Sequence, residues 1–377
     1  MTHASAARTA ALALLATGCR NAAAPSAGYE SAIGATVIER GVTCVDCTLA
    51  LTRIGTLGSP SDSILLDRRA FLTRLDDGRY IVAPTVVDGV AALFDSVGAP
   101  ARAIGRRGQG PGENQLVRGA YHWHGDRVLL LGAGDRLGWL DGSSMRETTA
   151  RTAKPWLLNR GVTLPDDGVV VANAFYEEQP LVVIDSNGSD RRWIGTSAPR
   201  DPHGHGRYYA LGPGNEAHTF WAAPLYYKLH FELWNVDGTL ERSIDRSPDW
   251  FTPYDTARFN RVVDAGDRAE RPFPQMHGVR ETKDGVLWGL YDVAAADWRA
   301  DQTAADAKPT RPDDLYHIGS YDGIIQLLDS HTGDLLLTAR IDRPLRGFVD
   351  DSTVYELRET QGGYWFIDLY RARFARQ

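Results

Sequence analysis

The chain has 377 residues, of which 43% are hydrophobic and 24% are charged. This composition excludes wholesale disorder and supports a large packed core. The formal net charge is −7, which argues against nucleic acid binding because that function requires a basic surface. Length alone is compatible with one large domain or with two to three ordinary ones.

The first nineteen residues have the features of an export signal. Residues 1–8 carry one arginine, residues 9–17 form a short apolar run, and Gly18 precedes Cys19. This order is typical of a signal peptide, and the run is too short to span a bilayer, which takes about 20 residues. The ending LLATGC resembles the lipobox of bacterial lipoproteins, which implies that Cys19 is acylated after cleavage. Ala16 stands where leucine is usual, and ordinary cleavage nearby is the alternative.

Residues 20–39 predict a flexible tether, because they are rich in Ala, Ser, Gly and Pro. No later apolar run has spanning length, so we expect the mature protein to be held at the cell envelope by its lipid alone. Arg20 and Asn21 lack the aspartate that resembles an inner-membrane retention signal. The expected location is therefore the outer membrane or the periplasm.

Cys44 and Cys47 follow the tether with the spacing CVDC. An even pair in an exported protein favours a disulfide. A redox pair is a second interpretation, although such a pair normally opens a helix and the neighbours here are β-branched. Free thiols or half of a metal site form a third. Thr48 in place of histidine after Cys47 excludes haem attachment.

Short apolar runs separated by turn signals dominate the rest of the chain. Dipeptides such as DG and NG between the runs are typical of antiparallel hairpins. The clearest predicted strands are Tyr80–Ala83, Val128–Leu131, Val169–Ala172, Leu181–Ile184, Val286–Leu290 and Leu335–Ala339.

Two anchors recur along these strands. The first is a turn followed by an apolar strand, at Gly78, Gly125, Gly168, Gly214, Gly285 and Asp351. The second is a strand that ends in a polar turn, at Asp95, Asp141, Asp185, Asn235, Asp329 and Asp368. The two anchors are 16 to 21 residues apart in five copies and 44 apart in the fifth, which therefore contains an insertion.

Six copies of a four-stranded unit predict an all-β fold, a six-bladed β-propeller over residues 40–377. A unit of about 45 residues cannot bury both of its faces alone, and radial repetition protects its edges. The sixth copy ends about where a third strand would end. We therefore expect Thr48–Ile54 to supply the missing fourth strand and to close the ring from the N-terminal side.

One blade junction resembles a known family. The segment ARAIGRRGQGPGE at residues 101–113 directly follows LFDSVG. This combination resembles a family of bacterial exported six-bladed propellers, whose members carry "FD–G", a strand and "IG–G-GPGE", and which relate loosely to NHL-repeat and TolB-like propellers. The match is close at this junction and weak at the other five. It implies the fold and an exported lipoprotein, but no activity.

Four long segments are expected to meet at one face of the propeller. Residues 105–114, 196–206 and 247–275 are predicted to connect the outer strand of one blade to the inner strand of the next, and residues 294–317 to connect a second strand to a third. Both kinds of connection share a face in a propeller. Long loops in a compact domain are usually functional, so we expect a binding site at the channel mouth. Decoration of a tolerant surface is the alternative.

Aromatic, basic and acidic side chains are concentrated at this face. Such a mixture suits sugars, peptides or anions, because rings stack and guanidinium groups form bidentate hydrogen bonds. The candidate ligand-binding residues are Arg106, Arg107, Glu113, Glu177, His203, His205, Tyr226, Tyr227, Lys228, Trp250, Tyr254, Arg258 and His277. Alternatively, Glu113 pins its own loop, and Arg106 and Arg107 form a solvated surface. Trp250 and Phe251 would then form a small core within the insertion.

The sequence predicts no catalytic residue, no cofactor and no metal site. It lacks a G-x-S-x-G elbow and an HExxH helix, and GRRGQGPGE lacks the Lys-Ser/Thr of a phosphate loop. The pairs His122/His124 and His203/His205 have the spacing that would let a strand present two ligands to one ion. No third ligand can be assigned to either pair.

Three functions remain open at this stage. The first is non-enzymatic binding of a small molecule, glycan, peptide or envelope protein at the channel mouth. The second is a metal-dependent enzyme of the lactonase or lyase type, since gluconolactonase-like propellers resemble this chain in blade number. The third is a scaffold in an outer-membrane complex. None of them involves nucleic acid.

Overall fold

The computed structural model describes residues 32–59, 64–85, 91–108, 113–114, 117–123, 127–132, 134–141, 147–156, 158–164, 168–173, 179–185, 190–195, 209–226, 228–253, 255, 257, 271–299 and 318–376. The export signal with Cys19 lies outside these ranges. Nearly every described element is a β-strand, and a short 3-10 helix, η3, spans Ile318–Ser320. In the described ranges, no helix is both long enough and apolar enough to cross a membrane.

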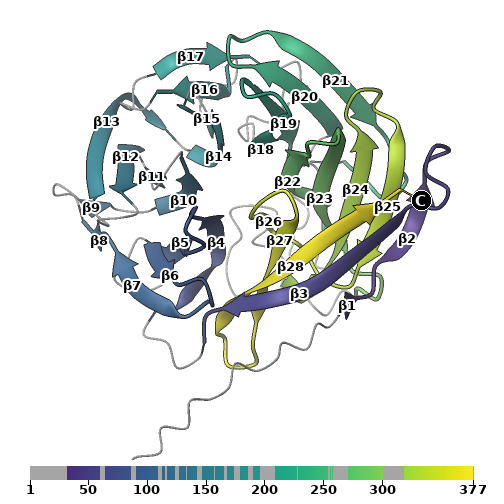
Figure 1. The fold of residues 1–377 in the computed structure, drawn as a ribbon, viewed down its shortest axis with the longest axis horizontal. Helices are drawn as coiled ribbons and strands as arrows, with labels where there is room; N and C mark the ends of the chain where they lie inside the picture. The colour runs from purple at the N-terminus through teal and green to yellow at the C-terminus, as the bar shows by residue number, and fades with distance from the viewer. Residues whose placement is uncertain are drawn as a thin grey trace, which may run out of the picture.

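Six antiparallel sheets form a ring around a central axis (Figure 1), which confirms the predicted six-bladed β-propeller. One edge strand of each sheet lies nearest the axis and the other lies at the rim. We number the sheets as blades 1 to 6 in chain order.

Blades 1 to 3 have four strands each, which follow one another from the axis outward. Blade 1 contains β4 (Leu66–Arg74), β5 (Tyr80–Thr85), β6 (Ala91–Phe94) and β7 (Pro100–Ile104). Blade 2 contains β10 (Val117–His122), β11 (Arg127–Gly132), β12 (Gly134–Asp141) and β13 (Glu147–Trp156). Blade 3 contains β14 (Leu158–Leu164), β15 (Gly168–Asn173), β16 (Leu181–Ile184) and β17 (Asp190–Ile194).

Blade 4 also has four strands, whereas blades 5 and 6 have five. Blade 4 contains β18 (Tyr209–Pro213), β19 (Thr219–Pro224), β20 (Leu229–Asn235) and β21 (Leu240–Arg246). Blade 5 contains β22 (Gln275–Glu281), β23 (Val286–Ala294), β24 (Tyr321–Asp329), β25 (Leu335–Ile341) and β2 (Thr36–Arg40). Blade 6 contains β26 (Gly347–Phe348), β27 (Thr353–Glu359), β28 (Trp365–Ala375), β3 (Thr48–Leu57) and β1 (Ala32–Ile33). The inner strands of the six blades are β4, β10, β14, β18, β22 and β26.

The hydrophobic core lies between the blades. Buried apolar residues form six clusters, one at each interface between neighbouring blades. In β5, Tyr80 and Val82 pack toward blade 6, and Ile81 and Ala83 pack toward blade 2. Because side chains of a strand alternate between its two faces, a strand between two blades must be apolar on both. This explains why all six predicted apolar runs lie within strands.

The ring closes as the sequence predicts. β3 pairs antiparallel with β28, from Leu57 opposite Ile367 to Thr48 opposite Ala375, and the two strands run side by side in Figure 1. The N-terminal segment thus completes the last blade, so that the two ends of the chain are joined by backbone hydrogen bonds.

Two details differ from the sequence expectations. Residues 32–40, most of which were assigned to the tether, contain β1 and β2, which extend the rims of blades 6 and 5. The polar turn expected at Asp368 is absent, because β28 continues to Ala375 in order to pair with the whole of β3. Asp368 is tolerated inside the strand because Thr56 and Arg358 donate hydrogen bonds to its carboxylate.

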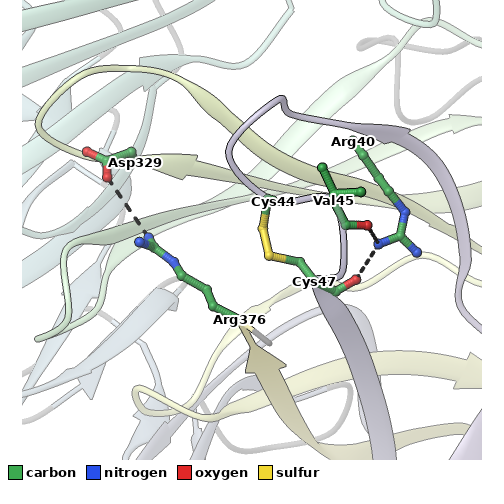
Figure 2. Close-up of a disulfide and its surroundings, with 6 residues drawn as sticks. All are labelled: Arg40, Cys44, Val45, Cys47, Asp329 and Arg376. Carbon is green, nitrogen blue, oxygen red and sulfur yellow. Dashed lines mark hydrogen bonds and ion pairs between the residues drawn. A yellow bond between two sulfur atoms is a disulfide. The ribbon is translucent and has the colours of Figure 1, made fainter.

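A disulfide between Cys44 and Cys47 lies in the turn that connects β2 to β3 (Figure 2). Both cysteines are 2% exposed and belong to the core between blades 5 and 6. The Arg40 guanidinium donates hydrogen bonds to the carbonyl oxygens of Val45 and Cys47, at 2.8 and 2.6 Å. The turn therefore links β2 of blade 5 to β3 of blade 6 at the place where the ring closes.

Candidate functional site

The strand order assigns the four long segments to the predicted kinds of connection. Residues 105–116, 195–208 and 247–274 each join the rim of one blade to the inner strand of the next, and residues 295–320 join β23 to β24. Because the strands of a blade alternate in direction, all four leave their strands at the same face. Most residues of these connections lie outside the described ranges, and the described candidate residues lie mainly on the neighbouring strands.

The predicted site residues fall into three groups: those outside the described residues, those described by their backbone alone, and those described with their side chains. Glu177, His203, His205, Tyr227, Tyr254 and Arg258 lie outside the described residues. Arg106 and Arg107 form the short strand β8 (Arg106–Arg107), which pairs in parallel with β9 (Glu113–Asn114). The side chains of Glu113, Tyr226, Lys228, Trp250 and His277 can be placed.

Glu113 folds back onto its own loop. Its carboxylate lies so close to Gly108 that a Cβ at that position would collide with it. The contact favours a role for Glu113 in holding the loop.

Trp250 and Tyr226 pack into the body of the protein. The Trp250 ring lies 5.9 Å from the ring of Phe251 and 5.2 Å from that of Tyr291 on β23, measured between centroids. Tyr226 is 6% exposed in the same cluster between blades 4 and 5. The small core expected within the insertion is thus continuous with an interface between blades, and these aromatic rings stabilise the fold at this point.

Lys228 belongs to a charge network in blade 4. Its ammonium group lies 2.5 Å from Asp245, whose carboxylate also contacts His230 at 2.8 Å. The other ring nitrogen of His230 lies 3.1 Å from the carboxylate of Glu232. We call these four residues the rim network.

His277 belongs to a second polar group, at the centre of the ring. Its Nε2 lies 2.6 Å from Oδ2 of Asp292 and 2.8 Å from Nη1 of Arg346. Arg346 also pairs with the same Asp292 oxygen, at 2.8 Å. His277 and Asp292 come from β22 and β23 of blade 5, whereas Arg346 directly precedes the inner strand of blade 6.

Arg160 reaches the same place from the opposite side of the ring. It lies on β14, the inner strand of blade 3, and its guanidinium carbon is 4.5 Å from the ring centroid of Phe71 on the inner strand of blade 1. Its charge also acts on Tyr121 in blade 2 and on Tyr355 in blade 6. A group that influences so many blades must lie near the axis. We therefore define the axial cluster as Arg160, His277, Asp292, Arg346, Tyr121 and Tyr355.

The electrostatics of the axial cluster favour an anion. Burial lowers the pKa of His277, and the charges of Arg346 and Arg160 lower it further, against the opposing effect of Asp292. Its imidazole is therefore neutral at neutral pH. The six residues of the cluster include two guanidinium groups and one carboxylate, so the cluster has one excess positive charge. Burial raises the pKa of Tyr121 to about 12 and also raises the pKa of Tyr355, so both phenols remain protonated.

The hydrogen bonds of the axial cluster are incomplete. Oδ1 of Asp292 and Nε of Arg346 are both buried and have no partner in the described part of the chain. Arg160 has no carboxylate partner among the described side chains. Buried polar groups are almost always hydrogen-bonded in folded proteins, so such vacancies are typical of a place where a ligand or water binds.

No three His, Cys, Asp or Glu side chains of the described residues are grouped as they would be in a metal site. In the axial cluster, the guanidinium of Arg346 already occupies Oδ2 of Asp292 at 2.8 Å. The positive charges of Arg346 and Arg160 disfavour a metal cation in this cluster, which therefore fits an anionic group better.

Sequence reasoning identified His277 but missed Arg160, Asp292 and Arg346. A signal was present, because Arg160 and His277 each lie eight residues before the glycine of the first anchor in their units, Gly168 and Gly285. Equivalent positions on inner strands lie at similar heights along the axis of a propeller. Comparing the inner strands position by position would have paired these two residues.

The closed ring defines a six-bladed β-propeller, and its described residues include a buried polar cluster near the axis. No protein-family profile matches the chain, and no curated protein matches it either.

Solved structures share the fold. The chain is similar to a protein from Bacteroides fragilis described as exported, with 12% identity, a TM-score of 0.55, and coverage of 90% of this chain and 98% of the other. It is less similar to the β-propeller domain of Swd1 from Myceliophteria thermophila, with 11% identity, a TM-score of 0.45 and coverage of 85% and 99%. It also resembles BamB from Moraxella catarrhalis, with 12% identity, a TM-score of 0.42, and coverage of 85% of this chain and 99% of the other. At such identities the likeness concerns the fold alone.

Proposed function

We propose that this protein is an exported, envelope-anchored propeller that binds a ligand or a protein partner at the mouth of its central channel. The observation that supports this best is the axial cluster, in which buried groups from several blades converge without completing one another's hydrogen bonds. Ligand sites in rigid folds are typically concave and contain a few convergent polar groups. The long connections between blades leave their strands at one face of the same ring, where a bound molecule would meet them.

Export is supported by the sequence and by the redox state of the chain. Residues 1–19 have the order of a signal peptide that ends in Cys19. The disulfide between Cys44 and Cys47 is of a kind that persists in oxidising compartments outside the cytosol. The similar protein of Bacteroides fragilis is described as exported, which agrees with this location.

The lipid anchor is tested by the Cys19→Ser variant. Acylation of this cysteine would hold the wild-type protein in the membrane fraction, so we expect the variant to move to the soluble fraction. Fractionation followed by immunoblotting measures this. A variant that stays with the membranes would show that Cys19 is not the anchor.

Binding at the channel mouth is tested with the purified mature chain. We expect at least one member of a panel of neutral sugars, sugar acids, peptides and envelope extracts to raise the melting temperature or to be retained by the protein. Binding should be lost in Arg346→Gln, in the axial cluster, and kept in Lys228→Gln, in the rim network. A ligand that binds both variants equally well would place the site elsewhere on the molecule.

A further inference from the structure

We infer that the axial cluster binds a hydroxylated carboxylate, either a free hydroxy acid or a uronic acid residue of a larger glycan. The inference rests on the proposed function, since it names the ligand class of the same site. It follows from three properties of the cluster: its excess positive charge, its fixed hydrogen-bond donors and its unused acceptor.

The excess charge comes from two arginines that influence the same two side chains, His277 and Tyr355. Arg160 and Arg346 both lower the pKa of His277, and both oppose the rise in the pKa of Tyr355 that burial causes. The contacts agree with this, because Arg346 lies 2.8 Å from Nε2 of His277, and Arg160 reaches from blade 3 to Phe71 on the inner strand of blade 1. Among the described residues of the cluster, Asp292 is the one carboxylate that balances the two arginines, and a ligand with one negative charge would neutralise the remainder.

The position of Arg160 suits it to a ligand. Its guanidinium lies over the ring of Phe71, 4.5 Å from the centroid. A guanidinium that stacks on an aromatic face keeps its N–H groups free at the edge, in the fork that matches a carboxylate. The Arg346 side chain is 18% exposed, so the cluster is open to solvent on at least one side.

Neutral donors accompany the two arginines. Because burial raises the pKa of Tyr121 to about 12, its hydroxyl remains protonated at neutral pH and can donate a hydrogen bond to a ligand. The Tyr121 ring packs directly against Gly119, where a Cβ would collide with it, and its buried hydroxyl has no hydrogen-bond partner in the described part of the chain. Preorganised donors of this kind reduce the entropy lost on binding.

The unpaired acceptor oxygen of Asp292 indicates a second group on the ligand. Oδ1 of Asp292 is buried and has no donor among the described residues, while Oδ2 is held by Arg346. A ligand hydroxyl would supply that donor. An ammonium group would supply it less well, because two guanidinium groups repel it. A phosphate dianion would be repelled by Asp292 and would exceed the single positive charge. These conditions together favour a hydroxylated monoanion.

Isothermal titration calorimetry of the mature protein with galacturonate tests the inference. We expect galacturonate to bind at least about tenfold more tightly than galactose, which has the same hydroxyls without the charge, since an ion-paired contact is worth about 1.4 kcal/mol or more. Galactose 6-phosphate should bind more weakly than galacturonate. Oligogalacturonides distinguish the sources: a higher affinity for them indicates a polysaccharide, and equal affinity indicates a free acid.

Three variants assign the binding to the cluster. Arg160→Gln should weaken galacturonate binding at least about tenfold, and Arg160→Lys, which keeps the charge without the fork, should lie between it and the wild type. Asp292→Asn should remove the advantage of galacturonate over cyclohexanecarboxylate, a carboxylate without hydroxyls. Arg280→Gln is the matched control, because Arg280 lies on the strand of His277 but pairs with the exposed Asp351. Circular dichroism verifies that each variant is folded.

The outcomes separate this inference from the proposed function. Equal affinity for galacturonate and galactose, tighter binding of the phosphate ester, or full binding by Arg160→Gln would overturn the ligand class. If another ligand binds and is lost in Arg346→Gln, the proposed function stands without the carboxylate. If no variant of the cluster affects any binding, both proposals fail.

Discussion

His230 and His277 are both buried, and both contact carboxylates, yet they differ in how completely they are paired. Both ring nitrogens of His230 meet an acid, at 2.8 Å from Asp245 and 3.1 Å from Glu232. The second oxygen of Glu232 accepts a hydrogen bond from Trp234 at 3.0 Å. Burial alone would lower the pKa of His230, but the hydrogen bonds and charges of the two carboxylates outweigh it and raise the pKa.

His277 lies in the opposite electrostatic environment. Burial and the neighbouring arginines lower its pKa despite its contact with Asp292, and polar atoms of Asp292 and Arg346 remain without partners in the described structure. The two histidines thus belong to two kinds of buried polar group. A network in which every group is paired stabilises the fold, whereas one with spare donors and a spare acceptor is available to a ligand.

The largest expected effect comes from breaking the rim network. In Glu232→Ala, His230 loses one of its two carboxylate partners, and Trp234, in the interface between blades 3 and 4, loses its hydrogen-bond acceptor. Removing one partner of a buried ion pair costs about 3–5 kcal/mol. We therefore expect the free energy of unfolding to fall by about that amount in urea denaturation.

Glu241→Ala is the control for this prediction. Glu241 lies on the neighbouring strand β21, is exposed, and accepts one hydrogen bond from Asn235 at 3.2 Å. Its loss should change the free energy of unfolding by less than about 0.5 kcal/mol. Equal effects of the two substitutions would mean that the rim network does not stabilise the fold.

A smaller effect should appear in the pH dependence, with opposite signs at the two histidines. The raised pKa of His230 means that its contribution to stability is complete below about pH 6.5 and is lost as the pH rises through its pKa in the folded protein. The pKa of His277 is lowered, so its contribution is complete above about pH 6.5 and is lost as the pH falls through its folded value.

Two substitutions isolate these contributions. His230→Asn, which removes the group facing Glu232 and Asp245, should flatten the alkaline side of a plot of unfolding free energy against pH. His277→Asn, which removes the group facing Asp292, Arg346 and Arg160, should flatten the acidic side. Urea denaturation at intervals between about pH 5 and pH 9 measures both. If both variants flatten the same side of the plot, the two histidines do not titrate in opposite directions as proposed.

The fold was largely predictable from the sequence, because it depends on local patterns. Apolar runs between turn signals encode strands, and the placement of Thr48–Ile54 in the last blade followed from counting strands. The axial cluster was not predictable in the same way. Arg160 and Arg346 look like ordinary surface charges until six blades bring them to one axis. Similarly, Trp250 lies beside a long loop in the sequence, and its packing against Tyr291 depends on how blades 4 and 5 meet.

The least effect on stability is expected for Arg160→Met, which we compare with Arg346→Met in the same axial cluster. Arg160→Met loses no ion pair with a described residue and keeps an apolar side chain against Phe71, so the free energy of unfolding should stay within about 0.5 kcal/mol of the wild type or rise. Arg346→Met leaves the buried carboxylate of Asp292 without its guanidinium partner, which should cost about 3 kcal/mol or more. Urea denaturation compares the two. If Arg160→Met destabilises the protein as much as Arg346→Met does, Arg160 has a structural partner, and the axial cluster is a closed network like that of His230. If Arg160 can be removed without loss of stability, its guanidinium is not needed for the fold and is available to a bound anion.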